Sequence, residues 1–279
     1  MAAYDAVLGA WPVGYEELDV PTRLGPTHVV VSGDPAAPPL VLLPSFAGTA
    51  TVWRLNVEAL SHRYRTYAVD VIGQPGKSRA SRRLRSRRDF ARWFEDLLDS
   101  LGVQRASIVG CSFGAFLALS QAALTPERVE RVVMISPAGT FVGLSWRFAL
   151  IMRTAPLLRR LRRLLGDRRA PDITDLGPRR PPRDALWRTL ISVTMAEAPK
   201  VSVINAPVLS RSELRRVRAP ILLLIGERET LYDPQATIAL AQARVPGLEA
   251  AIVPNADHIA AMAQPDDVNA RILAFLARP

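Results

Sequence analysis

Short apolar runs alternate with helix-length segments along this chain of 279 residues, and this alternation strongly constrains its fold. The expected strands lie at 27–33, 39–45, 66–73, 106–112, 131–137, 220–227 and 249–255, with an edge strand at 15–20. From residue 39 onward these runs are almost continuously apolar, as in parallel strands covered on both faces. Helix-length segments lie between them, at 50–61, 86–102, 112–124, 234–244 and 264–277. The pattern predicts an α/β fold: a doubly wound, mostly parallel sheet of eight strands with helices on both faces.

One interval interrupts this alternation. Residues 138–217 form a stretch of about 80 residues without a convincing strand, which is far longer than an ordinary loop. Helical periodicity is present in LSWRFALIMRTAPLLRRLRRLL and again in RDALWRTLISVTMAEA, and a connector rich in proline and arginine separates the two. We therefore expect 138–217 to be an inserted helical lid, on a core formed by residues 1–137 and 218–279.

The net charge of +10 at neutral pH raises the question of a nucleic-acid or anionic-lipid partner. The cations are almost all arginine, since only Lys77 and Lys200 are lysines, and GC-rich codon usage explains that bias as well as selection for charge does. The sequence contains no basic motif interleaved with aromatic residues and no zinc-finger spacing. We therefore expect no nucleic-acid partner.

Features of secreted and membrane proteins are absent from the sequence. No run of about eighteen apolar residues appears, so we expect no transmembrane segment. The first twenty residues have no basic region ahead of an apolar stretch, and the single cysteine, Cys111, can form no internal disulfide. These observations predict a cytoplasmic protein.

The segment IVGCSFGAFLALSQ, at 108–121, joins a β-branched strand to a helix rich in alanine and leucine. Its GCSFG fits Gly-x-Ser-x-Gly, a pattern that a chain of this length contains by chance about one time in ten. After a buried strand, such a turn forces the serine into a strained conformation and raises its hydroxyl above the sheet. The helix that follows directs its free N–H groups at a developing oxyanion. Ser112 is therefore a candidate nucleophile.

A serine nucleophile needs a base, and the chain contains three histidines. His28 lies within an expected strand and His62 follows an expected helix among arginines, so structural or surface roles are favoured for both. His258 lies between the last strand and the terminal helix, where a loop can reach over the edge of the sheet. It is the candidate base.

An acid that orients His258 should follow another strand. The segment PILLLIGERETLYDP offers Glu227, Glu229 and Asp233, whereas the strand that ends near Ser136 is followed by no acid. The order Ser112, Glu229, His258 is the chain order of hydrolases that use this turn. Glu229 is the preferred acid, with Asp233 as the alternative.

Cys111 is a weaker candidate nucleophile. On a strand its side chain points to the face opposite that of Ser112, and a buried inert thiol is the common case. No spacing of His, Cys and acidic residues indicates a metal site, and GQPGKS has too few residues between its glycines for a phosphate-binding loop. We expect no metal and no organic cofactor.

Taken together, these motifs resemble those of the α/β-hydrolase superfamily, from about residue 15 to residue 279. Besides GCSFG, the segment AVDVIGQPGKS at 68–78 is similar to the Asp-x-x-Gly-x-Gly-x-Ser loop of the family. IGERE matches its Gly-x-x-acid block, with Glu229 where aspartate is commoner, and NADHIAAMAQPDDVNARILAFL matches its histidine block and last helix. The resemblance implies a serine hydrolase with an α/β-hydrolase fold and a helical lid.

The loop after the third strand departs from the family pattern. The family usually reads His-Gly there, whereas this chain reads Pro44-Ser45 in LLPSFAGTA. The resemblance implies that the backbone N–H groups of Phe46 and Phe113 form the oxyanion hole, to which Ser45 can add a hydroxyl.

The expected activity is hydrolysis of a carboxylic ester or thioester with an apolar acyl group, through an acyl-enzyme. The candidate pocket residues are Ser45, Phe141, Trp146, Trp187 and Met195, although packing of the lid onto the core also explains the apolar ones. Two other functions stay open. One is a natural-product tailoring enzyme, such as an acyltransferase, a cyclase or a lactone or C–C bond hydrolase, and the other is a catalytically silent fold that binds a ligand.

The lid carries a basic helix whose partner is open. In LLRRLRRLL, at 157–165, leucines recur at helical spacing and arginines at 159, 160, 162 and 163 fill the gaps. A solvated face on an arginine-rich protein is the simpler explanation. The alternative is an anionic partner: an acidic acyl-carrier protein, a coenzyme A thioester or an anionic bilayer surface.

Overall fold

The computed structural model describes residues 1–82, 84–143, 189–190, 194 and 207–278. In this part of the chain, eight strands form one sheet in the order β1-β2-β4-β3-β5-β6-β7-β8. Their bounds are β1 Glu16–Val20, β2 Thr27–Ser32, β3 Pro39–Leu43, β4 Arg65–Val69, β5 Ala106–Cys111, β6 Val129–Ile135, β7 Ile221–Gly226 and β8 Glu249–Val253. β2 pairs antiparallel with β1 and with β4, and all the other pairs are parallel. The carboxyl ends of β3 to β8 therefore meet at one edge, where α/β sheets bind their ligands.

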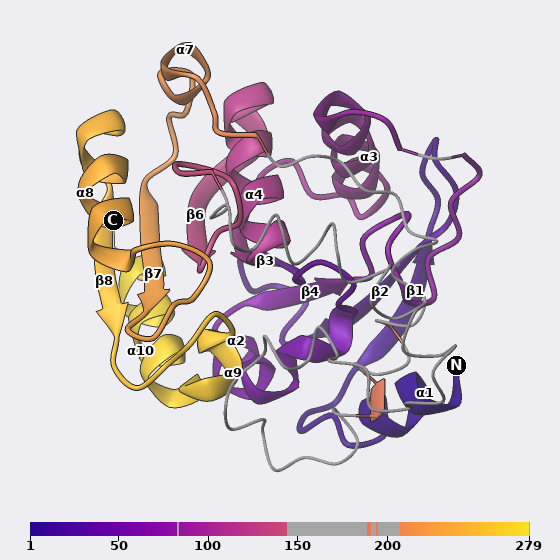
Figure 1. The fold of residues 1–279 in the computed structure, drawn as a ribbon. Helices are drawn as coiled ribbons and strands as arrows, with labels where there is room; N and C mark the ends of the chain where they lie inside the picture. The colour runs from indigo at the N-terminus through magenta and orange to yellow at the C-terminus, as the bar shows by residue number, and fades with distance from the viewer. Residues whose placement is uncertain (83, 144–188, 191–193, 195–206, 279) are drawn as a thin grey trace, which may run out of the picture.

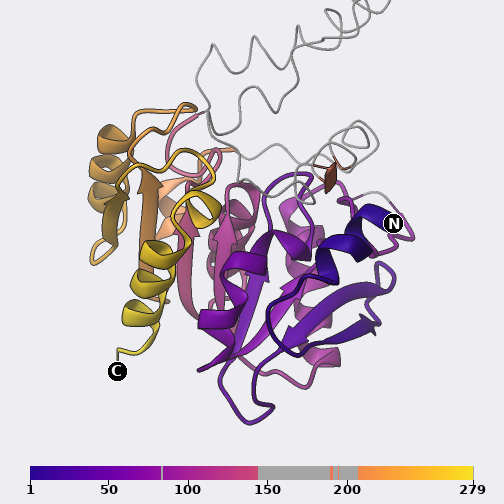
Figure 2. The same cartoon turned by 90° about the horizontal axis from the view of Figure 1, so that it is seen from below.

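Helices cover both faces of this sheet (Figure 1). One face carries α3 Arg87–Ser100, α4 Phe113–Leu124, α7 Arg211–Leu214 and α8 Pro234–Arg244. The other carries α1 Ala2–Leu8, the 3-10 helix η1 Ala50–Leu55, α2 Val57–Ser61, α9 Ala260–Ala263 and α10 Pro265–Leu276. A short 3-10 helix, η2 Pro126–Arg128, leads into β6. Figure 2 shows the two termini at opposite ends of the sheet.

Two hydrophobic cores result, one on each face, and the strands contribute alternate residues to them. In β3, Val41 and Leu43 belong to the core under α3 and α4, whereas Leu40 and Leu42 belong to the core on the other face. All of these side chains are at most 1% exposed. Because both faces of each central strand are buried, the strand sequences are almost continuously apolar. This pattern was the main evidence for the fold in the sequence, and the predicted fold class is confirmed.

The expected segment 50–61 divides into η1 and α2 at Asn56. The buried amide of Asn56 donates to Ala261 O at 3.0 Å and to Asn269 Oδ1 at 2.8 Å. Contacts more than 200 residues away in sequence thus fix this break, which no local pattern predicts. The short helices α1, α7 and α9 were also not predicted.

Most of the expected lid, 138–217, lies outside the described residues, including the basic segment 157–165. At its end, α7 begins with a capping box between Ser210 and Glu213. Arg87 of α3 pairs with Glu213, which joins α7 to the core. No helix within the described ranges is long and apolar enough to cross a membrane.

Candidate active site

Ser112 lies in a strained turn between β5 and α4. Its φ is 52° and its ψ is −109°, a conformation that costs a non-glycine residue roughly 1–3 kcal/mol. The flanking glycines allow this turn. A Cβ on Gly110 would lie 2.3 Å from Gly114 O, and a Cβ on Gly114 would lie 2.3 Å from Leu43 O. The start of α4 therefore packs directly onto the ends of β5 and β3.

The structure brings the side chains of Ser112, His258 and Glu229 together. Ser112 Oγ lies 2.8 Å from His258 Nε2. On the other side of the imidazole, His258 Nδ1 lies 2.7 Å from Glu229 Oε2. Ser112 is 6% exposed and the Glu229 side chain is fully buried. When Nδ1 carries the imidazole proton, it donates to Glu229, and Nε2 accepts the hydroxyl proton of Ser112.

Glu229 is held by the turn that follows β7. Its Oε1 accepts from Thr230 N at 2.8 Å and from Leu231 N at 2.9 Å. Burial alone would raise the pKa of the carboxyl, but hydrogen bonds from His258 and from these two backbone N–H groups outweigh it, so the pKa is lowered. Glu229 is therefore ionised at neutral pH.

The two neighbouring acids have other partners. Asp233 caps α8, where it accepts from Ala236 N at 2.7 Å. Glu227 accepts from Asn255 N at 2.9 Å and so holds the loop after β8. Of the three acids that the sequence offered, only Glu229 contacts His258 within the part of the chain that the structure describes.

Gly226, the last residue of β7, is a positioning feature that the sequence reasoning missed. A Cβ there would lie 2.3 Å from Asp257 O and 2.7 Å from Ala256 O. Arg228 N donates to Ala256 O at 2.8 Å, which ties the turn after β7 to the loop that carries His258. The glycine three residues ahead of Glu229 in IGERE was the available signal, because a glycine at the end of a buried strand indicates a close approach of the backbone.

Phe46 and Phe113 come together beside Ser112. Their rings meet edge-on, with centroids 6.3 Å apart. Ser112 N donates to Ile135 O, whereas the backbone N–H groups of Phe46 and Phe113 have no hydrogen-bond partner among the described residues. Phe113 is the first residue of α4, so its N–H also lies at the positive end of the helix dipole. Free donors here can stabilise an oxyanion.

The remaining nucleophile and base candidates do not form such a chain of contacts. Burial, followed by the nearby charge of Glu229, raises the pKa of the Cys111 thiol to about 12, so it stays protonated. His28 is buried and contacts Tyr4, Glu17 and Asp70. His62 is exposed at the end of α2. Within the described ranges, no group of three His, Cys, Asp or Glu residues is arranged to hold a metal ion.

A cavity of about 20 Å³ lies next to the site. Chain neighbours of the site residues line it, namely Ser45, Cys111 and Ile259, together with Val52, Trp53, Ala261 and Met262. Of the predicted pocket residues, Ser45 lines this cavity and Phe141 is 2% exposed in the core under α3 and α4. Trp146, Trp187 and Met195 lie outside the described residues.

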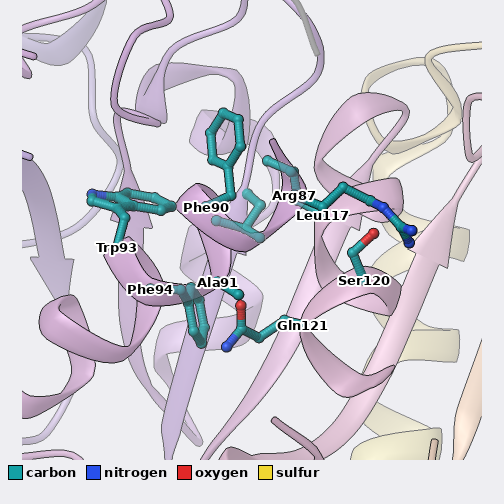
Figure 3. Close-up of a pocket in the computed structure, with 9 residues that line it drawn as sticks. Arg87, Phe90, Ala91, Trp93, Phe94, Leu117, Ser120 and Gln121 are labelled. Atoms are coloured by element: carbon teal, nitrogen blue, oxygen red, sulfur yellow. The ribbon is translucent and has the colours of Figure 1, made fainter. Parts of the chain in front are cut away.

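A second cavity, of about 10 Å³, lies between α3 and α4 (Figure 3). Aromatic residues of α3 and the side chains of Leu117, Ser120 and Gln121 of α4 surround it. It is about the size of one water molecule, and neither Ser112 nor His258 lines it. It belongs to the helix packing rather than to the site.

Sequence comparisons match this chain to known proteins over most of its length. The sequence model of the Alpha/beta hydrolase family matches residues 40–271. Carboxylesterase YbfK of Bacillus subtilis is 36% identical over 279 residues, which cover 98% of this chain and 92% of the relative. The uncharacterized carboxylesterase nap of the same organism is 34% identical, over 98% of this chain and 90% of the relative.

Solved structures of two esterases superpose on nearly the whole of this chain. The crystal structure of carboxylesterase CesB (YbfK) from B. subtilis superposes with a TM-score of 0.86 at 34% identity, covering 99% of this chain and 96% of the other. The naproxen esterase (carboxylesterase NP) from B. subtilis superposes with a TM-score of 0.81 at 31% identity, with the same coverage.

Proposed function

The chain belongs to the α/β hydrolase family and is an esterase, and we propose that it cleaves carboxylic esters through a Ser112–His258–Glu229 triad and an acyl-enzyme. The observation that carries the proposal is the unbroken chain of contacts from Ser112 Oγ through both imidazole nitrogens to the buried carboxylate of Glu229. Such a chain makes a serine hydroxyl nucleophilic at neutral pH.

In the first half of the reaction, Ser112 Oγ attacks the ester carbonyl carbon while its proton passes to His258 Nε2. Glu229 holds the imidazole by Nδ1 and stabilises the imidazolium that forms. The carbonyl oxygen becomes an oxyanion that accepts hydrogen bonds from the backbone N–H groups of Phe46 and Phe113. A donor of this kind lowers the barrier by about 3 kcal/mol. His258 then protonates the leaving alcohol, and the acyl group stays on Ser112.

In the second half, His258 takes a proton from water, and the resulting hydroxide attacks the acyl-enzyme carbonyl. The same N–H groups hold the second oxyanion. Its collapse breaks the bond to Ser112 Oγ, which recovers its proton from His258, and the acid is released. None of these steps requires a metal ion, because the backbone N–H groups stabilise the negative charge that develops on the oxyanion.

We propose an apolar acyl group for the substrate. The aromatic ring of Phe113, the residue after Ser112, contacts that of Phe46, and the adjacent cavity is lined by Val52, Trp53 and Met262. One solved relative carries the name naproxen esterase. The proposed substrates include both oxygen esters and thioesters. An acidic carrier protein is one proposed bearer of such a thioester.

Turnover of p-nitrophenyl esters by Ser112→Ala tests the mechanism. We expect kcat to fall by a factor on the order of 10³–10⁶, because the mutant lacks the nucleophile. The control is Cys111→Ala, which should keep most of the activity. A Ser112→Ala protein with wild-type turnover would rule out the triad. Separately, a matched panel of oxygen esters and thioesters ranks the substrates of the wild type.

A further inference from the structure

We propose that Gln74 is a positioning residue for the oxyanion hole: it holds the loop of Phe46 in the conformation that presents the N–H of that residue. This inference rests on the proposed function and extends it to a residue outside the triad and the oxyanion donors.

The loop in question is a tight turn at 45–48. Gly48 N donates to Ser45 O at 2.9 Å, and Ala47, the third residue of the turn, has a φ of 55°. A closed turn with a positive φ only at its third position has the geometry of type II, which normally requires glycine or asparagine there. Alanine at this position is strained by about 1–2 kcal/mol, so other contacts have to hold it.

Gln74 supplies such a contact. Its side-chain Oε1 accepts a hydrogen bond from Ala47 N at 3.1 Å. Gln74 is 6% exposed and Ala47 is fully buried, so this hydrogen bond is shielded from solvent. The N–H of Ala47 belongs to the peptide that joins it to Phe46. Type I and type II turns differ by a flip of this central peptide, so its partner selects between them.

Gln74 lies on a loop that is held closed by a hydrogen bond to a buried carboxylate. The fully buried carboxylate of Asp70 accepts from Lys77 N at 2.7 Å, which closes the loop that carries Gln74. The same carboxylate accepts from Ala50 N at 2.7 Å, which ties that loop to the start of η1. A Cβ on Gly76 would lie 2.5 Å from this carboxylate, so glycine permits the close approach. Asp70 and Gln74 thus hold both ends of the segment 47–50.

The position of this turn matters because it faces the start of α4. A Cβ on Gly114 would lie 2.6 Å from Pro44 O, so the two oxyanion donors approach from backbone segments in direct contact. A flipped or shifted peptide after Phe46 would move one donor of the pair while leaving Ser112, His258 and Glu229 in place. The third position of the turn is Ala47 rather than glycine, and the hydrogen bond from its N–H to Gln74 holds it in this conformation.

The test is Gln74→Met, which has a similar shape but no oxygen acceptor. We expect kcat for p-nitrophenyl esters to fall 10- to 100-fold and KM to change by less than about twofold, since the lost interaction acts in the transition state. The inhibition constant of an alkylboronic acid, which binds Ser112 as a tetrahedral boronate, should rise by the same factor as kcat falls.

The matched control is Thr66→Val. It removes an equally buried hydrogen bond, from Thr66 Oγ1 to Ser32 O at 3.1 Å, far from the turn. It should lower the unfolding temperature as Gln74→Met does and leave kcat and the boronate affinity unchanged. Gln74→Ala, which also lacks the acceptor, serves as a second variant if Gln74→Met does not fold.

A folded Gln74 variant that keeps kcat and boronate affinity within threefold of Thr66→Val would overturn the inference. The proposed function fails separately, if Ser112→Ala still turns over esters and the wild type binds no boronate. If Ser112→Ala is inactive and the wild type binds the boronate, an unchanged Gln74→Met refutes only the role of Gln74.

Discussion

At the residue scale, the carboxylate that contacts His258 belongs to Glu229, the last residue of the turn that begins at Gly226. Its Oε1 is held by two backbone N–H groups, so only Oε2 faces the imidazole. The turn thus accommodates a side chain that is one methylene longer than the aspartate that is commoner at this position. The sequence offered Glu227, Glu229 and Asp233, and their spacing alone could not decide which partner each would take, because those partners lie on α8 and on the loop after β8.

Glu229→Gln should lower kcat by a factor on the order of 10³–10⁴, because an amide can hold the wrong imidazole tautomer and carries no charge to stabilise the imidazolium. Asp233→Asn is the matched control: asparagine caps a helix about as well as aspartate does, so both kcat and stability should be retained. Steady-state kinetics of the two variants decide the assignment, and a loss confined to Asp233→Asn would reverse it.

Gly226→Ala should misplace His258 without removing any catalytic group. The new Cβ would collide with backbone atoms of Ala256 and Asp257, which cannot move aside as a flexible side chain does. We expect kcat to fall by about 10²-fold, as for displacements of about 1 Å in other active sites. Gly14→Ala is the control, since nothing lies within 4 Å of its Cβ. Equal kcat values for the two variants would show that Gly226 does not position the base.

At the element scale, β5, the turn at Ser112 and α4 were predictable because their constraints are local. Apolar β-branched residues, paired glycines and small helix residues each have a reason within a few positions of Ser112. The division of 50–61 into η1 and α2 was not predictable, since Asn56 is held by residues of α9 and α10. The conformation of the turn at 45–48 was not predictable for the same reason, because it depends on Gln74, which is distant in sequence.

A polar cluster around the buried side chain of His28 connects α1, β1, β2 and the loop after β4. His28 Nε2 lies 2.9 Å from Glu17 Oε2, and His28 Nδ1 lies 3.3 Å from Asp70 Oδ2 and from the Tyr4 hydroxyl. Lys77 pairs with Glu17 and with Asp5 of α1. Burial alone would lower the pKa of His28, but Asp70 and Glu17 outweigh it, and the pKa is raised above 6.5.

A raised pKa means that protonated His28 stabilises the folded state. This contribution is complete below pH 6.5 and is lost as the pH rises through the pKa of the folded state. The difference in unfolding temperature between the wild type and His28→Gln should therefore be largest near pH 6 and shrink as the pH rises. Thr66→Val, which removes a buried hydrogen bond but no titratable group, should give a difference that stays constant over the same range. A His28→Gln difference that grows with pH would contradict the sign of the shift.

At the scale of the whole molecule, the parallel sheet explains why residues more than 100 positions apart meet. Ser112 follows β5, Glu229 follows β7 and His258 follows β8, and all three strands end at the same edge. Their chain order and their places after strands could be predicted from sequence. The distances between their side chains could not, because they depend on backbone approaches such as that of Gly226 to Asp257.

The central claim is that Ser112 is the nucleophile and that His258 activates it. Labelling with an alkyl fluorophosphonate tests this directly, since the serine oxygen displaces fluoride and leaves a stable phosphonyl adduct that peptide mass spectrometry can locate. We expect a single adduct, on Ser112, absent from Ser112→Ala and formed far more slowly in His258→Gln. An adduct on another residue, or undiminished ester hydrolysis by a wild-type protein that takes up no label, would contradict the mechanism.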